Sequence, residues 1–279
     1  MHWIAPAKIN IFLRVLNKRA DGYHNIFSLM QKVALCDEVI FSPRPKGVVL
    51  HCSGMNLPAN NENLVVRAAK AIFDYCKYSG GMEITLHKKI PVTAGLGGGS
   101  SDAATTLMAL NKICSFKLKK NELIKIGAKI GADVPFFIFG NEALASGIGD
   151  KLKHLRNLPK LDIILVKPPL ELSTKMVYEN LNLRLTRGKN NYSIPRILDL
   201  SDIVHVLHND LESVSLQIYP ELADLKKMLL RHGALGALMS GSGPTVFGIF
   251  RNGKEAKQAL EVIEKELSDQ YLLFLAKSL

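Results

Sequence analysis

A glycine- and serine-rich run holds the residues of this chain whose types and spacing best suit chemistry. Residues 91–104 read Pro-Val-Thr-Ala-Gly-Leu-Gly-Gly-Gly-Ser-Ser-Asp-Ala-Ala. Glycine lets the backbone adopt positive φ and approach an anion closely, so that successive N–H groups can point toward it. Where such a loop opens a helix, the helix N-terminus adds partial positive charge. The run therefore indicates a phosphate-binding loop that receives further donors from Ser100 and Ser101.

The pattern after the loop predicts a helix, because apolar residues recur there at the spacing of one helical face: Ala103, Leu107, Leu110 and Cys114. We expect the Ser-Ser-Asp sequence at 100–102 to cap its start. A Walker A loop would need Gly-Lys-Ser/Thr, but Gly99 is followed by serine. A dinucleotide fingerprint would need glycine where this chain has Ser100, and an acidic residue about 20 positions later. Neither of these two motifs fits the run. A flexible turn without a ligand is the remaining alternative.

The N-terminal segment contains two polar residues that could act on an anion. Apolar residues alternate with polar ones between Ala7 and Leu16, which predicts a strand with one apolar face. Lys8 and Asn10 share the opposite face. On this pattern alone, a solvent-exposed lysine and asparagine are the simpler interpretation.

The elements around these residues predict an α+β first lobe. We expect a turn at 20–22, an extended segment through 33–35, and strands near 39–41, 48–52 and 82–86. One helix would place Leu64, Ala68, Ile72 and Tyr75 on a single face. A second helix is marked by the spacing of Leu123, Ile126 and Ile130. The segment 131–137 would end that helix and return to the core.

A second lobe is predicted after a boundary near 149–159. It would begin with an apolar strand at 161–166 and continue through helices capped by residues such as Ser173 and Asn209. The last part reads as strand 234–239, glycine turn 240–244, strand 245–250, helix 254–267 and strand 271–275, a split βαβ layer. We therefore expect two domains, 1–155 and 156–279.

Composition indicates a globular protein. The chain has 279 residues, 47% of them hydrophobic and 22% charged, which suffices for two lobes. No apolar run approaches the roughly 18 residues of a membrane span. With no export signal at the start and four cysteines that form no Cys-x-x-Cys pair, we expect a cytoplasmic protein without a disulfide framework or zinc site. The net charge of +11 is dispersed and the 7% aromatic residues do not follow it, which favours small anionic partners over nucleic acid. The oligomeric state is not predicted.

Taken together, the motifs resemble the GHMP kinases, the small-molecule kinases of galactose, homoserine, mevalonate and phosphomevalonate. That family shares Pro-x-x-x-Gly-Leu-Gly-Ser/Gly-Ser-Ser for ATP, which residues 91–101 match. Further similar segments follow in family order at 6–10, 19–24, 62–64, 131–137, 209–212 and 239–245. Within the family, the Arg-x-Asp-Gly-Tyr-His string at 19–24 resembles members that act on a cytidine diphosphate alcohol. Departures at Cys114, Asn141 and Asp150 lie outside the expected reacting groups.

The resemblance implies a two-lobed α+β fold, with an N-terminal lobe like domain 2 of ribosomal protein S5 and a ferredoxin-like C-terminal lobe. It implies an ATP-dependent kinase that phosphorylates the 2-hydroxyl of a cytidine diphosphate alcohol in the methylerythritol phosphate route to isoprenoids. Magnesium would arrive with ATP, and its direct protein ligands are not predicted. The alternatives are the same chemistry on mevalonate, phosphomevalonate or homoserine, or a ligand or nucleic-acid binder without turnover.

The resemblance also assigns roles to individual residues. Asp133 would accept the proton of the hydroxyl, and Lys8 would stabilise the ionised carboxylate and the transferred phosphoryl group. Asn63 would contact adenine, although it could equally cap a helix. The ATP loop would comprise Pro91, Val92, Thr93, Ala94, Gly95, Leu96, Gly97, Gly98, Gly99, Ser100 and Ser101. The substrate residues would be Asn10, Tyr23, His24, Thr174, Tyr178, Ser240, Gly241, Ser242 and Gly243.

Overall fold

The computed structural model describes residues 1–55, 60, 62–155, 157–182, 194 and 196–279, and they form two compact units. Unit 1 comprises Met1–Ala7, Leu35–Val92 and Gly97–Asn141. Unit 2 comprises Lys8–Ala34, Thr93–Leu96 and Glu142–Leu279. The glycine loop is therefore divided between the two units.

Two long strands, β1 (His2–Lys18) and β2 (His24–Arg44), contribute residues to both units. β1 confirms the alternating strand predicted around Lys8, and the turn before β2 contains Gly22 with φ of 86°. The prediction of separate strands at 33–35 and 39–41 is wrong, because both lie in β2. No glycine or proline interrupts the chain between His24 and Ser42, so nothing in this segment ends the strand.

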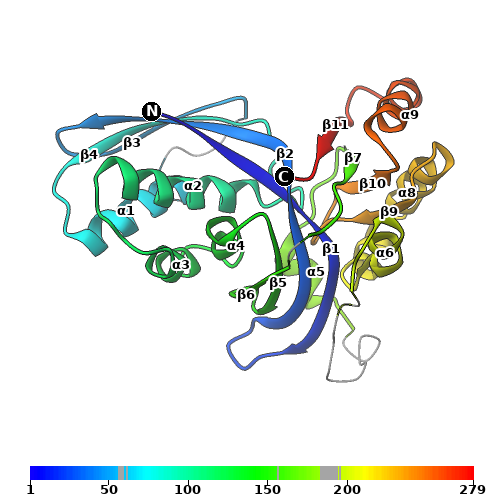
Figure 1. Ribbon diagram of the computed structural model, residues 1–279, viewed down its shortest axis with the longest axis horizontal. Helices are drawn as coiled ribbons and strands as arrows, with labels where there is room; N and C mark the ends of the chain where they lie inside the picture. Colours follow the sequence, from blue (N-terminus) through cyan, green and yellow to red (C-terminus); the bar gives the residue numbers. More distant parts are fainter. Residues whose placement is uncertain (56–59, 61, 156, 183–193, 195) are drawn as a thin grey trace. The chain divides into compact units, whose positions relative to one another are not determined.

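Unit 1 builds a sheet covered by helices. Strand β4 (Gly81–His87) pairs antiparallel with β2 and parallel with β3 (Gly47–Ser53). Helices α1 (Leu64–Cys76), α2 (Gly98–Ile113), α3 (Lys120–Ala128) and α4 (Val134–Phe139) gather on one side of these strands (Figure 1). In α1, Ala68 and Ile72 are buried as expected, but Tyr75 is 54% exposed and lies outside the core.

Helix α2 begins earlier than the sequence suggests. Gly97 occupies the N-cap position with φ of 69°, and no side chain caps the helix. The prediction that the Ser-Ser-Asp sequence caps α2 is therefore wrong, since these residues lie within its first turns. Glycine can take the left-handed conformation that this start requires, so a side-chain cap is not needed to turn the chain.

Unit 2 contains the other halves of β1 and β2. Strand β5 (Glu142–Gly147) pairs with β2, and β6 (Lys151–His154) pairs with β5. β6 therefore occupies part of the 149–159 segment that we expected to separate two lobes. On the other edge, the two-residue strand β8 (His208–Asn209) pairs in parallel with β1. Asn209 is thus a strand residue and not the N-cap of the next helix, whose N-cap is Leu211.

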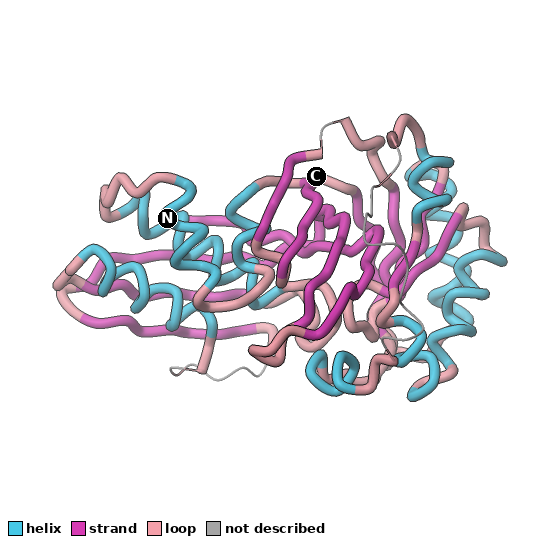
Figure 2. The backbone as a smooth tube through the Cα atoms, turned by 90° about the horizontal axis from the view of Figure 1, so that it is seen from below, coloured by secondary structure: helices cyan, strands magenta, loops and turns pink. Residues whose placement is uncertain are grey.

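The rest of unit 2 is a ferredoxin-like layer. Strands β7 (Asp162–Lys167), β9 (Gly236–Met239), β10 (Val246–Phe250) and β11 (Leu272–Lys277) form an antiparallel sheet in the order β11-β7-β10-β9. Its helices are α5 (Thr174–Glu179), α6 (Leu200–Val206), α7 (Glu212–Ile218), α8 (Glu221–Arg231) and α9 (Gly253–Glu266). Figure 2 shows the strands of this layer with helices beside them. The split βαβ prediction is confirmed, as is the cap of α5 by Ser173.

Within the described part of the chain, no helix combines the length and apolar character that crossing a membrane requires.

Candidate active site

The first turn of α2 in unit 1 offers backbone donors to an anion. Ser101 N is the first amide to bond within the helix, to Gly97 O at 2.9 Å. The amides at 98–100 precede it and have no intrahelical acceptor, which is the arrangement that binds phosphate at helix N-termini. Gly98 also allows close packing, because a Cβ there would stand 2.9 Å from Ile90 Cγ2. This geometry agrees with the phosphate-binding role expected for the loop.

The part of the loop in unit 2, Thr93–Leu96, packs against the second glycine-rich segment, 240–245. Gly95 has φ of 74°, and a Cβ on it would overlap the carbonyl oxygen of Ser240. Thr245 N donates to Ala94 O at 3.4 Å. Gly95 is therefore required for the close approach of two loops, a role that the sequence did not suggest.

We expect Gly95→Ala to destabilise unit 2 by more than the roughly 1–2 kcal/mol that a left-handed conformation costs an L-residue, because the added Cβ also displaces Ser240. Gly233→Ala is the matched control, since Gly233 has φ of 94° but open space around its Cβ position. Thermal or denaturant unfolding of both variants measures the difference. Equal destabilisation would show that the contact with Ser240 contributes nothing.

Lys8 and Asn10 are buried, with exposed fractions of 4% and 2%, so the solvent-exposed interpretation of both residues is wrong. Lys8 Nζ donates to Asn10 Oδ1 at 2.6 Å, and Asn10 Nδ2 donates to Ser28 Oγ at 2.8 Å. Ser28 in turn donates to Phe12 O at 2.7 Å. Lys8 N bonds Leu96 O of the glycine loop at 2.9 Å. The ammonium of Lys8 is thus oriented by a buried hydrogen-bond chain.

The 240–243 segment lies against this pair. Ser240 Oγ donates to Gly95 O at 3.0 Å and accepts from Asn10 N at 3.4 Å. A Cβ on Gly241 would be 3.3 Å from both Lys8 Nζ and Asn10 Oδ1. The hydroxyls of Thr174 and Ser242 lie 2.8 Å apart. Unit 2 therefore brings together five of the residues predicted to bind substrate, namely Asn10, Thr174, Ser240, Gly241 and Ser242, while Gly243 follows directly in the chain.

Two more predicted substrate residues form a ring pair in unit 2. The rings of His24 and Tyr178 have centroids 5.1 Å apart and planes inclined by 30°. Burial lowers the pKa of His24, and the nearby charge of Lys18 adds to the effect, so the neutral ring is favoured. Tyr23 precedes this pair and is 59% exposed, with its backbone N–H bonded to Asp21 Oδ1 at 3.2 Å. The exposed ring of Tyr23 is available to stack on a base.

Asp133 stands at the N-cap position of α4 in unit 1, but its side chain makes no capping hydrogen bond. A helix cap is a common structural reason for an aspartate at this position, and the structure does not give Asp133 that role. Two residues earlier, a Cβ on Gly131 would lie 3.5 Å from Ser100 Oγ, so the segment that carries Asp133 runs beside the first turn of α2. Lys8 belongs to unit 2, and the contact between Lys8 and Asp133 stays a prediction.

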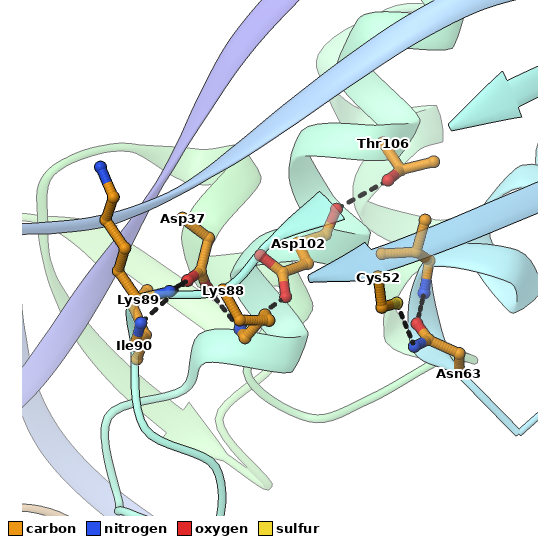
Figure 3. Close-up of polar contacts among 9 residues, drawn as sticks. Asp37, Cys52, Asn63, Lys88, Lys89, Ile90, Asp102 and Thr106 are labelled. Carbon is orange, nitrogen blue, oxygen red and sulfur yellow. Dashed lines mark hydrogen bonds and ion pairs between the residues drawn. The ribbon is translucent and has the colours of Figure 1, made fainter. Parts of the chain in front are cut away.

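Asn63 caps α1, since its Oδ1 accepts from Val65 N at 3.0 Å. Its Nδ2 donates to Cys52 Sγ at 3.9 Å (Figure 3). The capping role weighed for this residue is therefore confirmed, and its contact with adenine stays a prediction.

Sequence reasoning missed a buried charge cluster beside the loop in unit 1, formed by Asp37, Lys88 and Asp102 (Figure 3). Lys88 Nζ bonds Asp37 Oδ2 and, at 2.8 Å, Asp102 Oδ2. Asp37 Oδ1 also accepts from the backbone amides of Lys89 and Ile90, at 2.6 and 2.8 Å. The three side chains are at most 3% exposed. The cluster thus links β2, the segment after β4 and the first turns of α2.

The cluster contains two carboxyl groups but only one ammonium group to neutralise them. Burial raises the pKa of Asp102 to about 7, although Lys88 opposes the shift. Burial disfavours the charged form of Lys88, but Asp102 and Asp37 outweigh it and raise the pKa of Lys88. Asp102 Oδ1 has no hydrogen-bond partner among the residues that the structure describes. Only the place of Asp102 directly after the ATP loop could have signalled this cluster.

The chain matches two family models, the GHMP kinases N terminal domain over residues 63–141 and the GHMP kinases C terminal over residues 192–269. It belongs to the GHMP kinase family, and it is an ATP-dependent small-molecule kinase.

Relatives that the chain resembles within the family carry the name of one particular kinase. The chain is 53% identical, over 94% of both chains, to a "4-diphosphocytidyl-2-C-methyl-D-erythritol kinase" of Syntrophus aciditrophicus. It is 49% identical to one of Syntrophotalea carbinolica, over 93% of this chain and 92% of the relative. A crystal structure of a 4-(cytidine 5'-diphospho)-2C-methyl-D-erythritol kinase is similar with a TM-score of 0.82 and 33% identity, covering 100% of this chain and 99% of the other. A homoserine kinase from Cytophaga hutchinsonii has a TM-score of 0.71 at 21% identity, over 100% of this chain and 94% of the other, and shows the fold alone.

Proposed function

We propose that this protein transfers the γ-phosphoryl group of ATP to the 2-hydroxyl of 4-diphosphocytidyl-2-C-methyl-D-erythritol, giving the 2-phosphate and ADP in the methylerythritol phosphate route to isoprenoids. The observation that carries the proposal is the 53% identity, over 94% of the chain, to a kinase of that name. The buried and oriented Lys8 agrees with a phosphoryl-transfer site. We also propose a cytoplasmic location for the protein and a division into lobes 1–155 and 156–279.

Asp133 and Lys8 carry the transfer step in this proposal. The substrate hydroxyl oxygen forms a bond to the γ-phosphorus while the bond from that phosphorus to the β–γ bridging oxygen breaks. The hydroxyl proton moves to the carboxylate of Asp133, and ADP leaves with the bridging oxygen. Lys8, held by Asn10, supplies positive charge to the phosphoryl oxygens.

The nucleotide phosphates bind the free amides at the start of α2. Magnesium, when bound, neutralises phosphate charge. In the described part of the chain, no three His, Cys, Asp or Glu side chains gather to hold a metal. Ser101 Oγ, in contrast, is buried and has no partner among the described residues. Magnesium is a hard cation that prefers oxygen ligands, so the hydroxyls of Ser100 and Ser101 would hold it together with the phosphate oxygens.

The cytidine end of the substrate would be recognised by Tyr23, His24 and Tyr178. The exposed Tyr23 ring can stack on cytosine, and the neutral His24 ring, packed on Tyr178, can bond the polar edge of the base. Thr174 and the 240–243 segment would face the erythritol and diphosphate part of the substrate, near Lys8.

A coupled assay of ADP release tests the proposal. We expect the purified protein to consume ATP with 4-diphosphocytidyl-2-C-methyl-D-erythritol and to leave mevalonate, phosphomevalonate and homoserine unchanged. The reverse preference would defeat this substrate assignment and leave the family membership intact. Salt-sensitive RNA binding without kinase activity would favour a binding protein.

A further inference from the structure

Asn209 is a buried residue of unit 2 whose side chain uses both of its ends on backbone groups. It is 6% exposed. Its Nδ2 donates to Met239 O at 2.8 Å and to Gly241 O at 2.7 Å, and its Oδ1 accepts from Leu211 N at 3.0 Å. Only an amide side chain combines two N–H donors on one nitrogen with a neighbouring oxygen acceptor, and asparagine is the shorter of the two amide residues.

The same side of the 239–242 segment receives further support from α7. Glu212 Oε1 accepts from Met239 N at 2.9 Å, and Glu212 Oε2 is bonded by Lys226 Nζ at 2.7 Å. Ser215 Oγ donates to Ser242 O at 3.4 Å. Residues of β8 and α7 therefore hold this segment at three residues, Met239, Gly241 and Ser242.

The opposite side of the segment touches the group that the proposed function uses. A Cβ on Gly241 would stand 3.3 Å from Lys8 Nζ, and Ser240 Oγ bonds both Asn10 N and Gly95 O. Gly241 thus lies between the amide of Asn209, which holds its carbonyl, and the ammonium of Lys8. Its position sets the space in which that ammonium can stand.

We propose that Asn209 is a positioning residue for the phosphoryl transfer, which it supports by holding Gly241 against the ammonium of Lys8. This inference rests on the role of Lys8 in the proposed function. Asn209 binds neither nucleotide nor substrate in this scheme. Loss of its two donated hydrogen bonds would release Gly241 and let Lys8 leave the geometry that transfer needs, and a misplacement of about 1 Å can cost about 100-fold in rate.

The test compares Asn209→Asp with Asn252→Asp in the full-length protein. Aspartate at 209 keeps the acceptor for Leu211 N but turns the donor toward two carbonyl oxygens into an acceptor. Asn252 is the N-cap of α9 in the same unit, where its side chain accepts from Lys254 N and Glu255 N. Aspartate caps as well as asparagine. The variant also loses the exposed bond that Asn252 Nδ2 donates to Glu255 Oε1 at 2.9 Å, a surface contact outside the proposed site, so it should retain wild-type kinetics.

We expect Asn209→Asp to lower kcat by about 10- to 100-fold with KM for ATP changed by less than about twofold, because the amides at 98–100 that would bind the phosphates belong to unit 1 and not to the segment that Asn209 holds. A lower melting temperature with unchanged kcat per folded molecule would overturn the inference and leave Asn209 a purely structural residue.

Gly241→Ala supplies a second variant if Asn209→Asp does not fold. It adds a Cβ 3.3 Å from Lys8 Nζ at a residue with φ of 58°, and therefore disturbs the same link from its other end. We expect the same loss of kcat, with Gly233→Ala as the control for backbone strain. Unchanged kcat in Gly241→Ala would contradict the inference. If the wild-type protein phosphorylates a different alcohol, only the substrate assignment fails, because both variants can then be measured with that alcohol.

Discussion

Replacing Asp133 with asparagine is expected to lower kcat by about 100-fold or more, as the loss of a general base usually does, while ATP binding stays nearly intact. Asparagine has the shape of aspartate but cannot accept the hydroxyl proton. The side chain does not cap α4, so the substitution removes no capping interaction from the fold. Single-turnover kinetics with 4-diphosphocytidyl-2-C-methyl-D-erythritol measure the chemical step, and calorimetry measures ATP binding.

Asp74→Asn is the matched control for this experiment. Asp74 is an exposed residue of α1 in the same unit, and its substitution removes the same charge from the protein. We expect wild-type kcat for this variant. If Asp133→Asn also kept wild-type kcat, Asp133 would lose its role as the proton acceptor.

The second large effect concerns stability. Lys88→Met is expected to lower the free energy of unfolding by about 3–5 kcal/mol, the usual cost of removing one partner from a buried ion pair. Lys88 is the cation between Asp37 and Asp102, and all three side chains are at most 3% exposed. Denaturant unfolding well above pH 7 measures the full effect, because Asp102 has a pKa of about 7 in the wild-type protein and loses, in the variant, the cation that opposes the rise of that pKa.

Lys89→Met provides the control, because Lys89 is the next residue in the chain and pairs with Glu38 at the surface. Its side chain is 60% exposed, and exposed ion pairs contribute only about 0–1 kcal/mol. Equal destabilisation by the two substitutions would show that the buried cluster stabilises the fold no more than the surface ion pair does. Because Asp102 lies in α2, we also expect Lys88→Met to weaken ATP binding in the molecules that remain folded.

Local features of the fold were readable from the sequence. The glycines before an apolar helical stripe predicted a loop that opens α2, and alternation predicted β1. The order of strand, helix and strand near the C-terminus predicted the ferredoxin-like layer. In each case the signal lies within a few residues of the element that it describes.

Long-range contacts were not readable in this way. Lys88 is 51 positions from Asp37, and Asn209 is 32 positions from Gly241, so no spacing rule joins them. Nothing in their residue types distinguishes these side chains from surface ones. Lys8 is a similar case, because its strand pattern suggests exposure and only the resemblance to the GHMP kinases pointed to the buried position that the structure shows.

A crystal structure of the protein with a non-hydrolysable ATP analogue and 4-diphosphocytidyl-2-C-methyl-D-erythritol tests the central claim most directly. We expect a carboxylate oxygen of Asp133 within about 2.6–3.2 Å of the substrate 2-hydroxyl, Lys8 Nζ in contact with the γ-phosphate, and the phosphates on the first turn of α2. A 2-hydroxyl that contacts a different acid or base, with Asp133 or Lys8 directed away from it, would contradict the proposed site.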